Sequence, residues 1–396
     1  MENKSKNNSK EHLKHKIYLK DMILSYNKIN NYLNTLILKH SDKISKKILG
    51  YTNFKFPLSC YIIGKGSKHV LLFANTHGNE IITSHFLLEF ILTLVENTDI
   101  YMSYAKDFTF HFIPLLNPEG YVISSSIVTH NTYLKSQIDI EKLCKKYLEL
   151  YNLDDKIASQ KIYMKKNFTT VLESSSNHIP YYPLKKSVDS ILKSCKLDAS
   201  FLPIWAANGM GFDINSNSIH KFKQILLLRK SQKVGPLRYN DIPVTIPSPI
   251  CYPGRKAFDS KCPENIILYK YIKKLYTMNS NKNIDDSLCF IFSYHSTGGE
   301  VYGYPDSKIS TTKQVDIHLN AMNKYCDITN YRPIDENLKY GVMDFYRASL
   351  EGVVSLSIEL SNLNANPIGP YSNLRGLKKE FILNKEAIFN TIQEDI

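Results

Sequence analysis

Two histidines and two glutamates occupy positions from which they could act together on a metal ion and a water molecule. His77 and Glu80 follow one apolar segment, and His295 follows another, 215 residues after Glu80. Two imidazoles and a carboxylate can bind zinc and leave a fourth position for water. Glu359 lies inside the apolar segment Val-Val-Ser-Leu-Ser-Ile-Glu-Leu, where a carboxylate is costly to bury unless it is paired or used. These residues predict a zinc site with an additional acid.

Apolar segments of strand and helix type alternate along the chain and must position these residues. Strands are expected at 70–74, 108–116, 289–294 and 353–360, and helices at 22–38 and 81–95. This alternation predicts an α/β fold with a largely parallel or mixed sheet. Open α/β sheets bind ligands at the carboxyl ends of their strands, so residues that follow different strands can converge there.

Five short motifs contain or neighbour these residues. They are His77-Gly-Asn-Glu80, Asn117-Pro-Glu-Gly-Tyr121, Gly211-Phe-Asp-Ile-Asn215, His295-Ser-Thr-Gly298 and Ser357-Ile-Glu-Leu360. In this order, over about residues 22–385, the chain resembles the zinc carboxypeptidase family. The stretches 205–215 and 293–302 are most similar to the bacterial branch that cleaves γ-D-glutamyl-diamino-acid bonds of peptidoglycan peptides. The resemblance implies a mixed, mostly parallel, eight-stranded twisted sheet flanked by helices, with one zinc ion.

The resemblance also implies a role for each matching residue. His77, Glu80 and His295 would bind the zinc ion. Asp213 matches the acid that hydrogen-bonds the first ligand histidine and fixes its ring orientation. Asn215 matches a substrate-binding position. Glu359 matches the general base, which takes a proton from the zinc-activated water and returns it to the leaving nitrogen. The implied activity is hydrolysis of an amide bond near the C-terminus of a peptide.

Several substrate contacts of the family have no match in this chain. Many carboxypeptidases carry an Arg directly after the residue that matches Asn215. Ser216 stands there instead and is expected to contact the substrate with its hydroxyl; the peptidoglycan branch also tends to lack this Arg. No Arg precedes Arg229, so the oxyanion-stabilising Arg is missing, and a Lys could replace it only as a point charge. For the mobile tyrosine that covers the substrate, Tyr340 is the candidate and Tyr331 the alternative.

The motifs divide the chain into a tail and one domain. Residues 1–20 are expected to form a mobile basic tail, and residues 21–396 a zinc carboxypeptidase-like catalytic domain. An insertion at about 122–204 is either a specificity lid or a passive decoration of the rim of the site. The motif at 117–121 is expected to be a turn in the wall of the site.

Composition limits the compartment and the partners. The seven Cys include no Cys-x-x-Cys pair and are expected to be core residues of a protein in the reducing cytoplasm. The sequence contains no apolar run of about 18 residues, so a membrane-spanning helix is not expected. The basic N-terminus lacks the apolar segment that is typical of a secretion signal, so such a signal is not expected either. The first fifty residues hold eleven Lys against four acids, which is +7 of the total +13. With six Arg in all, specific nucleic-acid recognition is not expected.

Three functions remain open. The first is a zinc peptidase that acts on peptidoglycan stem peptides. The second is a zinc carboxypeptidase that trims protein tails, such as acidic C-termini, which the positive charge would steer toward the protein. The third is a non-catalytic zinc domain that binds a partner, including nucleic acid through the Lys-rich tail. The oligomeric state does not follow from the sequence.

Overall fold

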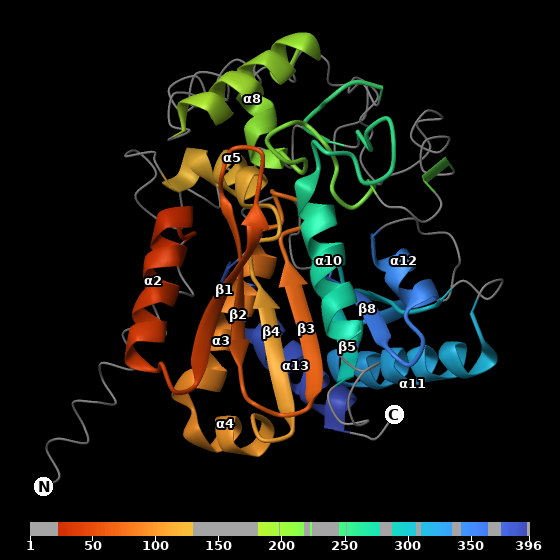
Figure 1. Ribbon diagram of the computed structural model, residues 1–396. Coiled ribbons are helices and arrows are strands. Elements are labelled where there is room, and N and C mark those ends of the chain that lie inside the picture. The colour runs from red at the N-terminus through yellow and green to blue at the C-terminus, as the bar shows by residue number, and fades with distance from the viewer. Residues whose placement is uncertain are drawn as a thin grey trace, which may run out of the picture.

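A computed structural model describes residues 23–129, 181–197, 199–217, 222–223, 245–250, 252–277, 287–305, 310–334, 342–362 and 374–393. In this part of the chain one sheet of eight strands occupies the centre of the molecule (Figure 1). The tail expected at 1–20, residues 130–180 of the expected insertion, and Tyr340 lie outside the described residues.

The sheet is mixed, with parallel strands at its centre. The strands are β1 (Ile44–Tyr51), β2 (Pro57–Ile63), β3 (Lys68–Ala74), β4 (Phe108–Ile113), β5 (Ser287–Gly298), β6 (Glu300–Tyr302), β7 (Arg332–Ile334) and β8 (Val354–Asn362). Their order is β1-β2-β4-β3-β5-β8-β6-β7. The pairs β3/β4, β3/β5, β5/β8 and β6/β7 are parallel, and the pairs β1/β2, β2/β4 and β6/β8 are antiparallel. The predicted mixed, mostly parallel eight-stranded sheet is confirmed.

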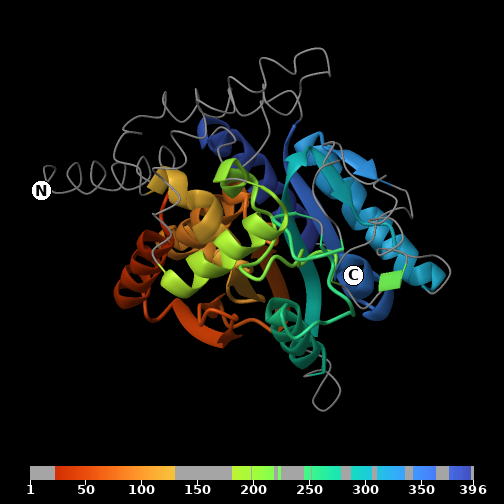
Figure 2. The same ribbon diagram turned by 90° about the horizontal axis from the view of Figure 1, so that it is seen from above.

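Helices cover both faces of this sheet (Figures 1 and 2). One apolar core joins the sheet to α2 (Tyr26–Lys39), α3 (Ile81–Glu96), α11 (Thr312–Thr329) and α13 (Leu374–Gln393). The second core joins it to α10 (Pro263–Thr277) and α12 (Val342–Ser349). The other described helices are α4 (Thr98–Tyr104), α5 (Pro118–Thr129), α8 (Tyr182–Ser194) and the short 3₁₀ helix η2 (Ala199–Ile204).

The residues of β3 show why a continuous apolar segment was needed in the middle of the sheet. Val70 and Leu72 belong to the core with α3, whereas Leu71 and Phe73 belong to the core with α10. Successive side chains of a strand point to opposite faces, so a strand covered on both sides needs apolar residues at every position. Each of these side chains contributes about 1.5–3 kcal/mol on burial. Their packing therefore fixes the end of β3 and, with it, the loop that contains His77.

Helix α3 is apolar around nearly its whole circumference because it lies between the sheet and α13. Phe90 makes edge-to-face contacts with Phe112 of β4 and Phe389 of α13, at centroid distances of 5.5 and 5.4 Å. Among the described helices, none alone has the length and apolar composition to cross a membrane; α3 and α4, bent by 93°, pass that test only as a pair. The burial of α3 in the core accounts for its composition.

Both expected helices are present, as α2 and α3, but two local expectations were wrong. The motif at 117–121 opens helix α5 instead of forming a turn. Pro118 suits the first helical position, where its missing N–H needs no partner. His295 lies inside β5, not after it, because β5 stays paired with β8 as far as Gly298.

The described cysteines carry free thiols, and all of them except Cys289 are buried. This agrees with their expected place in the core.

Candidate metal centre

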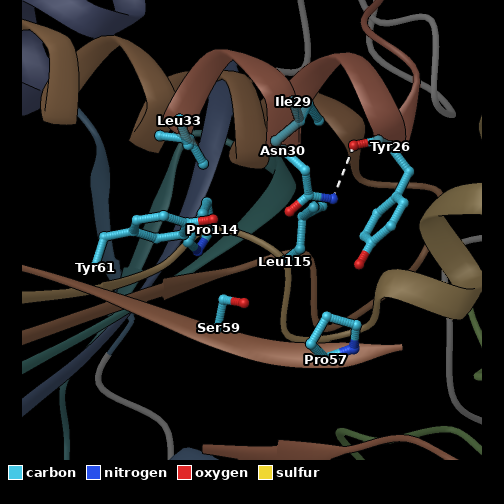
Figure 3. Close-up of a pocket in the computed structure, with 9 residues that line it drawn as sticks. All are labelled: Tyr26, Ile29, Asn30, Leu33, Pro57, Ser59, Tyr61, Pro114 and Leu115. Carbon is cyan, nitrogen blue, oxygen red and sulfur yellow. Dashed lines mark hydrogen bonds between the residues drawn. The ribbon is translucent and has the colours of Figure 1, made fainter. Parts of the chain in front are cut away.

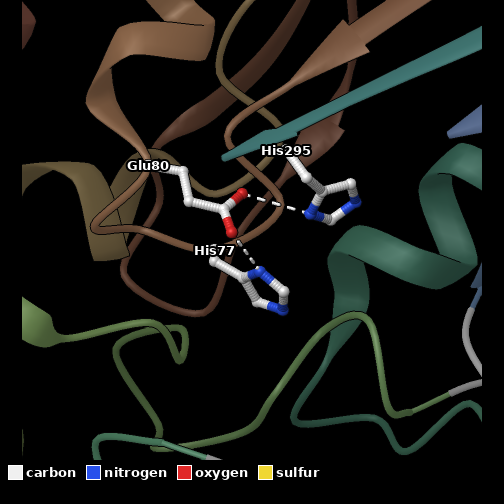
Figure 4. A group of neighbouring side chains, drawn as sticks. All are labelled: His77, Glu80 and His295. Atoms are coloured by element: carbon white, nitrogen blue, oxygen red, sulfur yellow. Dashed lines mark hydrogen bonds and ion pairs between the residues drawn. The ribbon is translucent and has the colours of Figure 1, made fainter. Parts of the chain in front are cut away.

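Three side chains from separate segments converge at the carboxyl end of β3 (Figure 4). His77 lies in the loop after β3, Glu80 immediately precedes α3, and His295 belongs to β5. Glu80 Oε1 lies 2.8 Å from His77 Nδ1, and Oε2 lies 3.1 Å from His295 Nδ1. One ligand atom from each residue lies within 4.8 Å of the other two. Two imidazole nitrogens and a carboxylate form a donor set that fits zinc, so the structure brings the three predicted ligands together.

Electrostatic interactions within the centre shift the pKa values of Glu80 and His77. Burial would raise the pKa of the Glu80 carboxyl, but the charges and hydrogen bonds of His77 and His295 lower it to about 2. Burial opposes protonation of His77, yet the Glu80 carboxylate and then Asp213 hold its pKa well above the ordinary value. The Glu80 carboxylate therefore favours a positive charge beside it, either a proton on an imidazole or a metal ion. A metal ion would replace protons at the imidazoles, which makes metal affinity dependent on pH.

Asp213 supports His77 from the side opposite Glu80. Its Oδ1 lies 3.5 Å from His77 Nε2, whereas Glu80 contacts Nδ1. A carboxylate at the second ring nitrogen sets the tautomer and orientation of a ligand histidine. Ser216 donates its N–H and its hydroxyl to the two oxygens of Asp213 and is 1% exposed. Ser216 thus holds Asp213 in place. Asn215, which is expected to contact the substrate, is half-buried.

Glu359 lies beside His295 across the parallel strands β8 and β5. The two residues are register partners, so their side chains leave the same face of the sheet, about 4.8 Å apart at the backbone. The neighbours Ile358 and Leu360 are fully buried, whereas Glu359 is partly exposed. Glu359 is therefore a candidate proton acceptor beside His295, one of the three residues of the centre.

The loops around His77 are held by residues that the sequence motifs contained without revealing their role. The Asn117 side-chain amide donates to the carbonyls of Ala206 and Ala207, at 3.2 and 3.1 Å. The N–H of Gly78 also donates to Ala206 O, at 2.9 Å. A Cβ on Gly78 would come within 2.4 Å of the carbonyl carbon of Gly120. The two glycines therefore allow the start of α5 to lie directly against the loop that contains His77, which we call the ligand loop.

Glu119 and Asn208 fix the loop that leads to Asp213. Glu119 accepts N–H bonds from Phe54 at 2.8 Å and from Gly209 at 2.9 Å, one on each oxygen. Asn208 Oδ1 accepts the N–H of Phe212 at 3.1 Å. The backbone of 208–212 is thereby held before it reaches Asp213. The sequence gives little indication of these roles, because the hydrogen-bond partners of a buried carboxylate or amide are known only from the folded structure.

Of the two tyrosines considered for the substrate-covering role, Tyr331 lies within the described residues. Tyr331 is buried, its hydroxyl donates to Glu380 of α13, and Asn384 donates to that hydroxyl at 3.1 Å. A residue bonded in this way is part of the packing between α11 and α13, so its proposed movement over a substrate is not supported. Tyr340 stays a prediction.

A small pocket between α2 and β2 offers different chemistry from the metal centre (Figure 3). Its lining side chains are all uncharged: Tyr26, Ile29, Asn30, Leu33, Pro57, Ser59, Tyr61, Pro114 and Leu115. The Asn30 amide donates to Tyr26 O at 3.0 Å. This uncharged lining contrasts with the ionisable side chains of the centre formed by His77, Glu80 and His295.

Comparisons with known proteins agree with this geometry. The model of the family described as zinc carboxypeptidase matches residues 29–151. The fold is similar to that of carboxypeptidase A from Helicoverpa armigera, with a TM-score of 0.55 and 14% identity, over 93% of this chain and 72% of that chain. It is also similar to bovine thrombin-activatable fibrinolysis inhibitor in complex with tick carboxypeptidase inhibitor, with a TM-score of 0.52 and 15% identity, over 94% of this chain and 99% of that chain. At these identities the solved structures establish the fold.

The sheet and its flanking helices have the fold of these carboxypeptidases, and the His-Glu-His centre is a possible metal site within it. The family model matches about the first third of the chain, and the solved structures share its fold, so the chain is similar to zinc carboxypeptidases in both respects.

Proposed function

We propose that this protein is a zinc-dependent carboxypeptidase that hydrolyses an amide bond near the C-terminus of a peptide. The observation that carries the proposal is the placement of Glu359 beside His295 in the register of β5 and β8, on the same face as the three-residue metal centre. A metal and a proton acceptor side by side are what hydrolysis of an amide by activated water requires.

Each residue of the centre has a defined task in this reaction. His77, Glu80 and His295 would hold a zinc ion, which would act as a Lewis acid that lowers the pKa of water and polarises a carbonyl. Glu359 accepts the proton of the attacking water and returns it to the leaving nitrogen. Asp213 keeps the His77 ring in the orientation that presents Nδ1 to the centre.

For the substrate, we infer a peptidoglycan stem peptide that is cut at a γ-D-glutamyl-diamino-acid bond. The support is Ser216, which stands where many carboxypeptidases carry the Arg that binds the terminal carboxylate. Its hydroxyl is bonded to Asp213, and a hydroxyl supplies only a neutral hydrogen bond of about 0.5–1.5 kcal/mol. Recognition would then depend on other features of the substrate, such as a D-centre, a γ-linkage or a diamino-acid side chain.

A paired substrate assay tests this proposal. Zinc-loaded protein is incubated with γ-D-glutamyl-diaminopimelate stem peptides and, separately, with L-peptides that end in acidic tails, and the products are identified by mass spectrometry. We expect cleavage of the stem peptides, and loss of that cleavage in the Glu359→Gln control. Cleavage of the L-peptide tails alone would favour the protein-trimming alternative. Hydrolysis of neither, with partner binding that requires residues 1–20, would favour a non-catalytic domain.

A further inference from the structure

A row of four ionisable residues crosses the sheet from the metal centre to its edge. His295 of β5 is the register partner of Glu359 in β8, Glu359 is that of Glu300 in β6, and Glu300 is that of Arg332 in β7. Register partners on neighbouring strands project from the same face of a sheet. Strands lie about 4.8 Å apart, so the backbone of Arg332 is roughly 10 Å from that of Glu359.

Contacts of both backbone and side chain fix the outer part of this row. A Cβ on Gly298 would lie 3.1 Å from Glu359 Cβ and 3.5 Å from Glu300 Cδ, so the two acids flank the same glycine. The N–H of Gly299 donates to Glu359 O at 2.9 Å, and Gly299 O accepts the N–H of Arg332 at 2.8 Å. Arg332 is therefore held in a defined position relative to Glu359.

The charges of the row assign different roles to Glu300 and Arg332. Arg332 donates to one oxygen of Glu300, and the Tyr302 hydroxyl donates to the other. The Glu300 side chain is 13% exposed, whereas that of Arg332 is 70% exposed. Glu300 lies next to a second acid, Glu359, and a cation beside it offsets their repulsion. Glu300 thus positions the guanidinium, and the guanidinium is the group that a molecule entering from solvent would meet.

We propose that Arg332, positioned by Glu300, binds a carboxylate of the substrate residue that leaves after hydrolysis. This inference rests on the proposed function, which places the scissile bond at the metal centre and Glu359. The leaving residue would then extend along the row toward β7. A planar guanidinium with five donors matches a carboxylate better than any other side chain does. The carboxylate is either the α-carboxylate of the leaving residue or one on its side chain, and both offer the same chemistry.

Two substrate pairs distinguish these sources. Stem peptides with diaminopimelate or lysine as the leaving residue differ by a side-chain carboxylate, and free or amidated peptides differ by the α-carboxylate. In Arg332→Gln, the KM for the carboxylate-bearing member of one pair should rise about 10- to 100-fold, while the KM for its partner changes little. Arg332→Lys keeps the charge without the fork and should recover only part of the loss. Lys39→Gln, which removes one exposed charge from α2, is the matched control.

A binding measurement gives a second result that does not depend on turnover. In the inactive Glu359→Gln protein, calorimetry should show that the added Arg332→Gln change weakens binding of the carboxylate-bearing peptide only. An equal loss for both members of each pair, or no loss at all, would refute the role of Arg332. If the wild type cleaves these peptides but Arg332→Gln changes no preference, the inference fails and the proposed function stands. If the wild type cleaves none and the inactive protein binds none, both fail.

Discussion

Replacement of Glu264 by Gln is expected to stabilise the protein, by an amount that increases with pH. Glu264 lies at the start of α10 and is fully buried, as is Glu119 of α5. Burial, and then the charge of Glu119, raise the pKa of Glu264 from the ordinary 4.5 to about 8. The amide of Asn208, 3.2 Å from a Glu264 oxygen, opposes this shift only in part. At neutral pH the folded protein therefore keeps a proton on Glu264.

The sign and size of the effect follow from the two pKa values. In the unfolded chain Glu264 loses its proton near pH 4.5, but in the folded protein it does so near pH 8. Between these values the folded state binds more protons, so the free energy of unfolding falls as pH rises. Each pH unit of this window costs about 1.4 kcal/mol, and the whole window costs on the order of 5 kcal/mol. Gln is neutral throughout and avoids this loss.

The single tryptophan provides the assay. Trp205 is fully buried, and its indole N–H donates to Asn208 O at 3.1 Å, so its fluorescence reports on the affected loop. Urea unfolding should show that the advantage of Glu264→Gln over wild type is several kcal/mol larger at about pH 9 than at about pH 5. Glu119→Gln is the control, because loss of one acceptor for two backbone N–H groups should cost about 1–3 kcal/mol even at about pH 5. An advantage of Glu264→Gln that is the same at both pH values would refute the reasoning.

Four further substitutions test the metal centre. His77→Ala or His295→Ala should lower zinc affinity by orders of magnitude, and near-stoichiometric zinc by elemental analysis after mild chelation would contradict the ligand assignment. Glu359→Gln should lower turnover by about 10²- to 10⁴-fold while zinc stays bound; near-wild-type hydrolysis would mean that another group activates the water. Asp213→Asn should weaken zinc binding by about 10- to 100-fold in competition with a chelator, and unchanged affinity would show that Asp213 does not support His77.

The convergence of His77, Glu80 and His295 could be predicted from the sequence, because each residue lies in or near a strand whose type is plain from its residues. The apolar segment that ends at Ala74 is buried on both faces, and such a strand can only deliver its following loop to the end of a sheet. Glu359 could be singled out because it interrupts an apolar strand. The register of β5 and β8 then places it beside His295.

The roles that the sequence left open depend on partners distant in the chain. The hydroxyl of Ser216 donates to Asp213, a partner that the residues around Ser216 do not indicate, and its contact with substrate stays a prediction. Nothing in the residues around Glu300 and Arg332 indicates that both share a row with Glu359, because β6 and β7 are three residues long and their register is set by tertiary pairing. Short strands carry too few residues for a periodic signal.

The polar residues around the centre form one connected framework, and this links the stability of the protein to its affinity for metal. Asn117 joins the start of α5 to Ala206, and Gly78 of the ligand loop donates to the same carbonyl. Asn208, two residues further along, contacts Glu264 and shapes the turn that leads to Asp213. Ionisation of Glu264 would place a second charge beside Glu119 and strain this turn. The effect would reach the metal centre without any change in His77, Glu80 or His295. Wild-type protein should therefore retain zinc less well above about pH 8 than Glu264→Gln does, since the support of His77 weakens in the same range.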